Sequence, residues 1–174
     1  FFAIRDGRHP NLTDQAGRLL DFDRDGFSEI PAGKHWFGDG ETESNVRELK
    51  HAFRLARLPL TNQIVDLFDP RRKERFDGYA RYSSEPSCPA IYLNWFDAWC
   101  LATWLHSQLP SEQQWERACR GNQVPPMPNH RWFGGDSEEE LDRVAWYFGN
   151  SNRVTHPIGG KQETKRANDF GLLH

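Results

Sequence analysis

The chain has 174 residues, enough for one domain that buries its own hydrophobic core without disulfides or a structural metal. Lys and Arg number 22 and Asp and Glu number 25, so the net charge is -3 and no basic excess exists to neutralise a phosphate backbone. No run approaches the roughly 18–20 apolar residues that span a bilayer, and no signal-peptide pattern is seen. We therefore expect no nucleic-acid partner, no membrane attachment and a cytoplasmic location.

The first segment is polar and contains a possible cation-binding turn. Residues 1–27 are rich in turn residues, so we expect a lead-in or linker there and a domain over residues 28–174. The alternation of Asp21, Asp23 and Asp25 before a glycine matches the first half of a calcium loop. Ala32 stands at the twelfth position, where the bidentate glutamate of an EF-hand would complete the coordination of the calcium ion. A looser calcium turn and a solvated acidic turn are therefore the two alternatives.

The next part of the chain predicts two strands and a short helix. Residues 30–38 (IPAGKHWFG) predict a strand bounded by glycines, and the period-two alternation of residues 53–58 predicts a second strand. Thr61 is expected to cap a short amphipathic helix that ends at Pro70. The basic cluster at residues 71–75 follows this helix, and we expect a solvated loop rather than a binding patch.

Two capped helices are predicted in the middle of the chain. Asn94 and Asp97 form a capping-box-like pair for the first helix, and Ser111 and Gln114 form an S-x-x-Q box for the second. On the first helix the apolar residues at helical spacing, which we expect to be buried, are Trp95, Ala98, Trp99, Ala102 and Leu105. On the second helix the corresponding stripe is Trp115, Ala118 and Cys119. Gly121 is expected to end the second helix.

The last part of the chain predicts little regular structure. Beyond Gly121 the sequence is rich in Pro, Gly and Asn, with brief apolar runs at residues 131–133 and 144–148. We expect long ordered loops and small strands there.

Residues with catalytic or metal-binding potential do not form a recognisable pattern. Cys88, Cys100 and Cys119 contain no C-x-x-C pair, so we expect buried thiols in a reducing compartment. The seven histidines show neither H-x-H nor H-E-x-x-H, and are expected at the surface or in hydrogen bonds. Glu112 and Glu116 lie four apart on one helix, where polar neighbours favour an exposed charged face over an acid/base pair. We expect no catalytic constellation within this sequence.

Several motifs nevertheless occur in an informative order. Residues 30–38 are similar to the motif I-P-A-G-x-F-x-M-G, and residues 109–121 (LPSEQQWERACRG) are similar to L-P-T-E-x-E-W-E-x-A-A-R-G, the most specific of the set. Further matches stand at residues 58–62, 88–98, 132–134, 144–147, 150–151, 155–159 and 168–172. In this order the motifs resemble the formylglycine-generating enzyme family, also called sulfatase-modifying factor domains.

This resemblance implies a fold and limits the enzymatic chemistry. It implies an α+β domain of the C-type-lectin-like type, with two short core helices, small antiparallel strands and long ordered loops. In the oxidases of the family, the last third of the domain holds a cysteine pair that binds copper and activates oxygen. The three cysteines here lie upstream of that region and the sequence stops at His174. We therefore expect a domain incomplete at its C-terminus, with copper bound only if the missing part exists.

The resemblance also bears on cofactor, partner and function. Family members bind calcium through loops of the later half, and Asn150 stands at about the position of one ligand. Retained scaffold motifs without the catalytic end favour a non-catalytic binding or recognition module, expected within a larger bacterial protein such as a diversified variable protein or a fused effector. Its partners would be a protein or peptide ligand or neighbouring domains of the same polypeptide. The alternatives are a copper-dependent formylglycine-generating or related oxidase whose catalytic end lies outside this sequence, and a carbohydrate binder that uses exposed Trp side chains.

Overall fold

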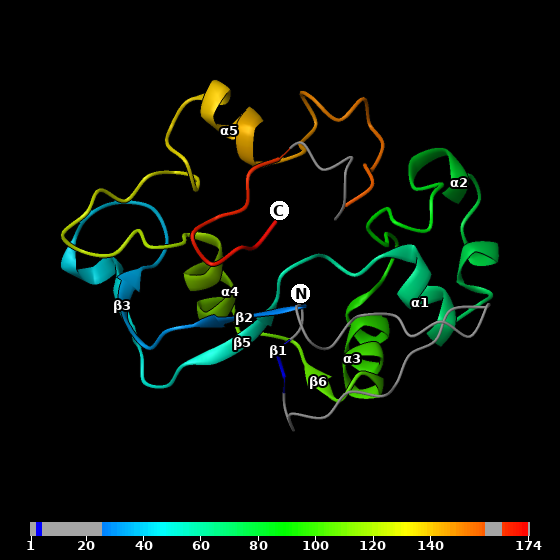
Figure 1. The fold of residues 1–174 in the computed structure, drawn as a ribbon, viewed down its shortest axis with the longest axis horizontal. Helices are drawn as coiled ribbons and strands as arrows, with labels where there is room; N and C mark the ends of the chain where they lie inside the picture. Colours follow the sequence, from blue (N-terminus) through cyan, green and yellow to red (C-terminus); the bar gives the residue numbers. More distant parts are fainter. Residues whose placement is uncertain (1–2, 5–25, 159–164, 174) are drawn as a thin grey trace.

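The computed structural model describes residues 3–4, 26–158 and 165–173. In this part of the chain, short helices, small antiparallel sheets and long loops follow one another (Figure 1), which confirms the expected α+β class. None of the helices in these ranges is long and apolar enough to cross a membrane.

The larger sheet has four strands in the order β2-β5-β1-β6, and all neighbouring strands are antiparallel (Figure 1). Its strands are β1 (Ala3–Ile4), β2 (Phe27–Ile30), β5 (Phe53–Ala56) and β6 (Ser107–Gln108). β2 pairs with β5 along its whole length, from Phe27 opposite Ala56 to Ile30 opposite Phe53. The strand predicted over residues 53–58 is therefore confirmed in its first four residues.

The second sheet is a hairpin of β3 (Gly33–Trp36) and β4 (Val46–Leu49), joined through a 3-10 turn, η1 (Glu43–Asn45). The sequence predicted one strand over residues 30–38, and this was wrong, because β2 and β3 belong to different sheets. Pro31 has no N–H to donate to a ladder, and Gly33 adopts a φ of +130° that side chains rarely permit. The chain therefore turns between Ile30 and Lys34.

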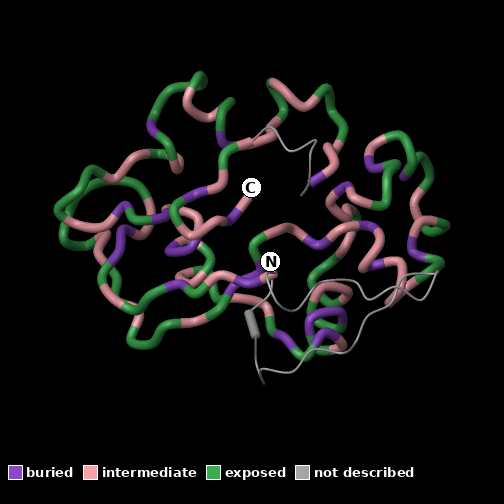
Figure 2. Tube along the Cα trace, in the orientation of Figure 1, coloured by how far each residue is buried: buried purple, intermediate pink, exposed green. Residues whose placement is uncertain are grey.

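One part of the core lies where α1 (Asn62–Phe68) packs against α3 (Trp95–Trp104). Its buried members are Leu60, Val65, Leu101, Ala102 and Leu105. Figure 2 shows the buried stretch of α3. Helix α1 confirms the helix predicted after Thr61, although the Thr61 side chain makes no capping hydrogen bond and the backbone alone begins the helix.

Helix α3 has the predicted capping box of Asn94 and Asp97, and Ala102 and Leu105 of its predicted apolar stripe are buried. The side chains of Trp95 and Trp99 are 62% and 50% exposed, whereas Leu101 is fully buried. The prediction that the two tryptophans face the core was therefore wrong. Apolar residues occur around most of this helix (WFDAWCLATW), so periodicity alone does not select the buried side.

The other part of the core joins the larger sheet to α4 (Glu112–Cys119), which has the predicted Ser111–Gln114 capping box. Its buried members are Ile30, Leu55, Ala118 and Leu172. The C-terminal segment runs beside α4 in Figure 1, and Asn168 Nδ2 donates to the Ala118 carbonyl oxygen at 2.7 Å. Gly121 follows the helix with a φ of +62°, as expected of a residue that ends a helix.

Three further elements were not predicted. A 3-10 turn, η2 (Arg72–Arg75), and a single helical turn, α2 (Tyr79–Tyr82), follow α1. In the region where only loops and small strands were expected, α5 (Glu138–Val144) forms. Ser137 and Glu140 make a complete capping box for this helix, and the acidic residues of its first turn favour the positive end of the helix dipole.

Candidate ligand-binding site

An aromatic cavity lies between α4, the loop at residues 131–133 and α5. Its volume is about 290 Å³. Its apolar walls are formed by Trp115, Trp132, Phe133, Leu141, Val144 and Ala145. Cavities of this kind, mostly apolar with a few polar groups, are the usual form of a site for a small ligand or an anchoring side chain.

A tight turn places the aromatic wall. The backbone N–H of Trp132 donates to the Gly135 carbonyl oxygen at 3.2 Å, and the Gly135 N–H donates back to Trp132 at 3.3 Å. Gly135 has a φ of +141°, and a Cβ there would lie 2.2 Å from an oxygen of the Glu140 carboxylate. A glycine is therefore required for this turn to approach the first turn of α5. The turn and α5 are in this way fixed relative to each other.

A partly buried ion pair forms the polar part of the cavity wall. Oε1 of Glu116 accepts hydrogen bonds from the Gly38 N–H at 2.8 Å and from Nε and Nη2 of Arg120 at 2.9 and 2.6 Å. Arg120 also donates to the carbonyl oxygens of Gly38 and His130 and to the side-chain oxygen of Asn129. The Glu116 side chain is only 17% exposed, so the predicted exposed charged face of this helix was wrong at Glu116. Glu112 is exposed as predicted.

Two exposed guanidinium groups lie over aromatic rings of the cavity. The Arg131 guanidinium is 4.7 Å from the centroid of the Trp132 ring, and the Arg166 guanidinium is 5.7 Å from that of Phe133. Neither has an ion pair with a residue in the described ranges. The edge of the cavity therefore carries two guanidinium groups, and the Asp136 carboxylate lies beside one of them, Arg131. The Glu116 charge inside the cavity is balanced by Arg120.

The cysteines differ in environment. Cys119 lies in the cavity wall, where burial raises the pKa of its thiol to about 12, so the nucleophilic thiolate is absent at neutral pH. Cys88 is buried, and its Sγ lies 3.6 Å from the Thr155 carbonyl oxygen. Cys100 is exposed on α3. The expectation of three buried thiols was therefore wrong for Cys100.

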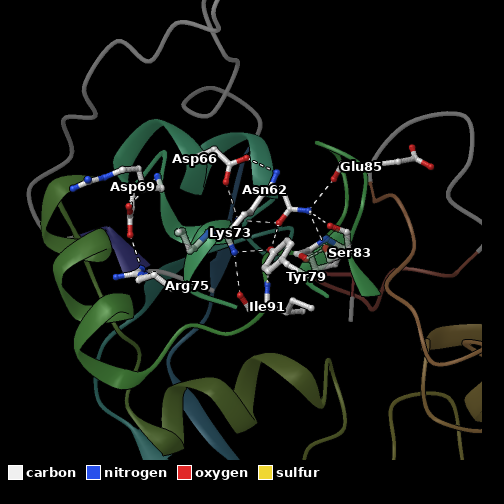
Figure 3. Close-up of polar contacts among 12 residues, drawn as sticks. Asn62, Asp66, Asp69, Lys73, Arg75, Tyr79, Ser83, Glu85 and Ile91 are labelled. Carbon is white, nitrogen blue, oxygen red and sulfur yellow. Dashed lines mark hydrogen bonds and ion pairs between the residues drawn. The ribbon is translucent and has the colours of Figure 1, made fainter. Parts of the chain in front are cut away.

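A second polar cluster lies in the core beside α1 (Figure 3). The fully buried Arg72 donates to Oδ1 of Asn62 at 3.1 Å and to Oδ1 of Asp66 at 2.9 Å, and also to the Tyr79 hydroxyl. Asn62 Nδ2 donates to Oγ of Ser83 at 2.8 Å. The predicted solvated loop at residues 71–75 was therefore wrong at Arg72. These hydrogen bonds join α1, η2 and α2, which indicates a structural role, although Nε of Arg72 has no partner in the described structure.

The predicted calcium ligands fall in two places. Asp21, Asp23 and Asp25 lie outside the described residues. Asn150 is described, and its Oδ1 accepts from the Tyr147 N–H at 2.9 Å while its Nδ2 donates to Oδ1 of Asp142 at 2.9 Å. The same Asp142 carboxylate raises the pKa of Tyr147 by accepting its hydroxyl hydrogen bond. No group of three or more His, Cys, Asp and Glu side chains suited to a metal occurs within the described ranges, so calcium stays a prediction.

One histidine is buried without a complete set of partners. His35 on β3 is fully buried, and its Nε2 has no hydrogen-bond partner in the described structure. Burial lowers the pKa of His35 from its ordinary value, and the positive charge of Arg117 acts in the same direction. The weak contact from Nδ1 to the Gly33 carbonyl oxygen, at 3.5 Å, opposes the shift. His35 is therefore a neutral core residue at physiological pH.

The fold and cavity define a small α+β domain with an aromatic cavity. The family model for the sulfatase-modifying factor enzyme 1-like domain matches residues 21–174, and the chain belongs to this family. A curated relative is the formylglycine-generating enzyme of Thermomonospora curvata, 34% identical over 65 residues. That match covers 30% of this chain and 22% of the relative.

The sequence did not reveal the cavity. The sequence contained part of the pattern from which the cavity could be predicted, because Trp115 follows a capping box and the 132–134 segment matches a family motif. The third wall, α5, was not predicted at all, and the cavity is incomplete without the Leu141 and Val144 side chains of this helix. Attention to the S-x-x-E pattern at Ser137 and Glu140 would have identified the missing wall.

Proposed function

We propose that this chain is a non-catalytic binding module on a C-type-lectin-like scaffold of the formylglycine-generating-enzyme type, and that the cavity between α4 and α5 is its ligand-binding site. The observation that carries the proposal is the cavity itself, with two tryptophans and a phenylalanine around about 290 Å³. Sites of this size anchor a single large side chain, so a protein or peptide segment is the ligand that fits best. Neighbouring domains of the same polypeptide are one source of such a segment.

The state of the cysteines supports binding rather than thiol chemistry. A nucleophilic or metal-binding cysteine is a thiolate in a partly exposed, electropositive environment. In the cavity, Cys119 has the opposite character, because burial keeps its thiol protonated. Cys88 belongs to the core, and Cys100 lies on α3 away from the residues of the cavity wall.

The proposal is tested by selecting binders from a random peptide library displayed on phage. Isothermal titration then gives the dissociation constant of the tightest peptide for the wild type and two variants. We expect Trp132→Ala to weaken binding at least tenfold, because it removes a wall of the cavity, and Trp99→Ala on the exposed face of α3 to change it less than twofold. Equal affinities of Trp132→Ala and wild type would contradict the proposed site.

One observation favours a second function, namely the match to an enzyme that bears the name formylglycine-generating enzyme. This alternative is an oxidase whose catalytic end is not in this sequence. It is tested by incubating the purified protein with copper and a cysteine-containing sulfatase-motif peptide and following the peptide mass. Copper-dependent conversion of the cysteine to formylglycine would replace the binding proposal. We expect the peptide to stay unmodified.

A further inference from the structure

We infer that the α4–α5 cavity takes the aromatic side chain of a partner segment in which acidic residues flank that side chain. This inference rests on the proposed binding function and specifies the chemistry of its ligand. Two independent features carry it: the shape and lining of the cavity, and the distribution of charge around it.

The lining selects an aromatic ring. Apart from the Glu116–Arg120 pair, Arg131 and Cys119, every residue of the cavity wall is aromatic or aliphatic. Aromatic side chains bury more apolar area than any others and gain further from edge-to-face or offset contacts with Trp115, Trp132 and Phe133. A volume of about 290 Å³ lies at the lower end of ligand pockets, so it suits one large side chain better than a whole small ligand.

The two guanidinium groups over the rings disfavour a cationic ligand, and the Asp136 carboxylate beside Arg131 offsets part of their charge. An aromatic cavity with a carboxylate would otherwise suit an ammonium group through cation–π contacts. Here the Glu116 carboxylate is held by Arg120 at 2.6 Å, and the rings of Trp132 and Phe133 already carry the guanidinium groups of Arg131 and Arg166. A ligand cation would meet these two positive charges, whereas a carboxylate beside the inserted ring would pair with them.

The acidic first turn of α5 does not cancel this preference. Glu139 is paired with Arg143 at 2.5 Å, and the Glu140 carboxylate accepts hydrogen bonds from Ser137 within the capping box. The positive end of the α5 helix dipole further offsets the charge of this turn. The α5 residues that line the cavity lie in the second half of the helix, at Leu141 and Val144.

The other exposed aromatic surface is a weaker site. On α3, Trp95, Phe96 and Trp99 are all exposed, and Trp95 packs against both neighbours. None of these three residues lines the α4–α5 cavity, and no guanidinium lies over their rings in the described structure. This surface therefore provides the internal control for the test.

Three short peptides test the inference against the full chain: Ac-Gly-Asp-Trp-Asp-Gly-NH2, its Lys-Trp-Lys counterpart and its Asp-Ala-Asp counterpart. Dissociation constants are measured by titration of the ¹⁵N-labelled protein at low salt. We expect the Asp-Trp-Asp peptide to bind at least tenfold more tightly than each of the others. Equal binding of the Lys-Trp-Lys peptide would overturn the charge requirement, and equal binding of the Asp-Ala-Asp peptide would overturn the ring requirement.

Two surface variants locate the charge effect without disturbing the core. Preference for the acidic peptide is the Kd of the Lys-Trp-Lys peptide divided by that of the Asp-Trp-Asp peptide. Arg131→Gln is expected to reduce this ratio at least threefold. Arg153→Gln is its matched control, because Arg153 is also an exposed arginine over a ring, that of Phe148, but does not line the cavity. An equal effect of the two variants would overturn the inference.

The peptide series also separates this inference from the proposed function. If none of the three peptides binds but the library-selected peptide still requires Trp132, the ligand chemistry inferred here is wrong and the binding function stands. If the library-selected peptide requires Trp99 instead, both are wrong.

Discussion

Arg72 and Arg75 lie in the same basic cluster of the sequence but in opposite environments. The side chain of Arg72 is fully buried, whereas that of Arg75 is 50% exposed and pairs with Asp69. Nothing in five consecutive charged residues identifies the one that turns inward. The partners that satisfy Arg72 come from α1 and from the Tyr79 hydroxyl, and only the fold brings them together.

Removal of the buried arginine is expected to destabilise the protein strongly. Arg72→Met removes a fully buried guanidinium that donates to Asp66, to Asn62 and to the Tyr79 hydroxyl. We expect a loss of about 1.5–3 kcal/mol in the free energy of unfolding, the range for hydrogen bonds that involve a charged group. The matched change Arg75→Met removes an exposed ion pair and is expected to cost less than about 1 kcal/mol. Urea unfolding followed by Trp fluorescence measures both. Similar losses in the two variants would contradict the structural role of the Arg72 cluster.

The buried His35 predicts that stability depends on pH. Because its folded-state pKa is lowered, the unfolded state binds more protons in the pH range between the ordinary value of about 6.5 and the lower folded-state pKa. We expect the free energy of unfolding contributed by this group to be constant at higher pH and to fall as the pH drops through 6.5 toward the folded-state pKa. The slope for one proton is at most about 1.4 kcal/mol per pH unit.

Two histidine variants test this assignment. His35→Gln is expected to flatten the pH dependence of the unfolding free energy between pH 7.5 and about pH 5. His51→Gln changes an exposed histidine and is expected to leave the dependence as in the wild type. An unchanged slope in His35→Gln would show that other groups cause the pH dependence.

The helices show which local signals the sequence carries reliably. The Asn94 and Ser111 capping boxes were predicted and are present, because each depends on two residues three positions apart. The buried side of α3 was not predictable, since tertiary packing selects one side of a helix that is apolar around most of its circumference. The break at Pro31 follows from proline chemistry, because proline has no N–H to donate to a strand ladder.

Helix capping gives a testable prediction at the scale of single helices. Ser111→Ala removes a side chain that accepts the Gln114 N–H, and we expect a loss of about 1 kcal/mol in the free energy of unfolding. Thr61→Ala is the natural comparison, because Thr61 precedes α1 but its side chain makes no capping hydrogen bond. Its loss is expected to be only a few tenths of a kcal/mol. Denaturant unfolding that ranks the two in the reverse order would contradict this account of the helix starts.

For the whole molecule, the order of the motifs along the sequence predicted the family, whereas the chemistry of single residues predicted no site. The family was predicted from ordered motifs, and the family model over residues 21–174 confirms it. Those motifs encode core packing and turns, such as Ala118 against Ile30 and the glycine turn after α4. They contain some of the residues of the cavity wall, such as Trp115 and Trp132, but do not predict α5, which completes the wall.

The acidic segment gives a prediction for the whole chain. If Asp21, Asp23 and Asp25 bind calcium, the ion stabilises the folded state, and the stabilisation rises with the logarithm of the calcium concentration above the dissociation constant. We expect a higher Tm in millimolar calcium chloride than in chelator, and we expect the difference to vanish when the three aspartates are changed to asparagine. Equal Tm values of the wild type in calcium and in chelator would contradict the prediction.

The central claim is that ligands bind in the cavity between α4 and α5, and the seven tryptophans allow it to be tested in one titration. The indole N–H resonances of ¹⁵N-labelled protein are followed as the tightest library-selected peptide is added. We predict that the resonances of Trp115 and Trp132 shift with a common saturation curve while those of Trp95 and Trp99 stay in place. Saturable shifts at Trp95 and Trp99 with Trp115 and Trp132 unchanged would contradict the claim and place the site on α3.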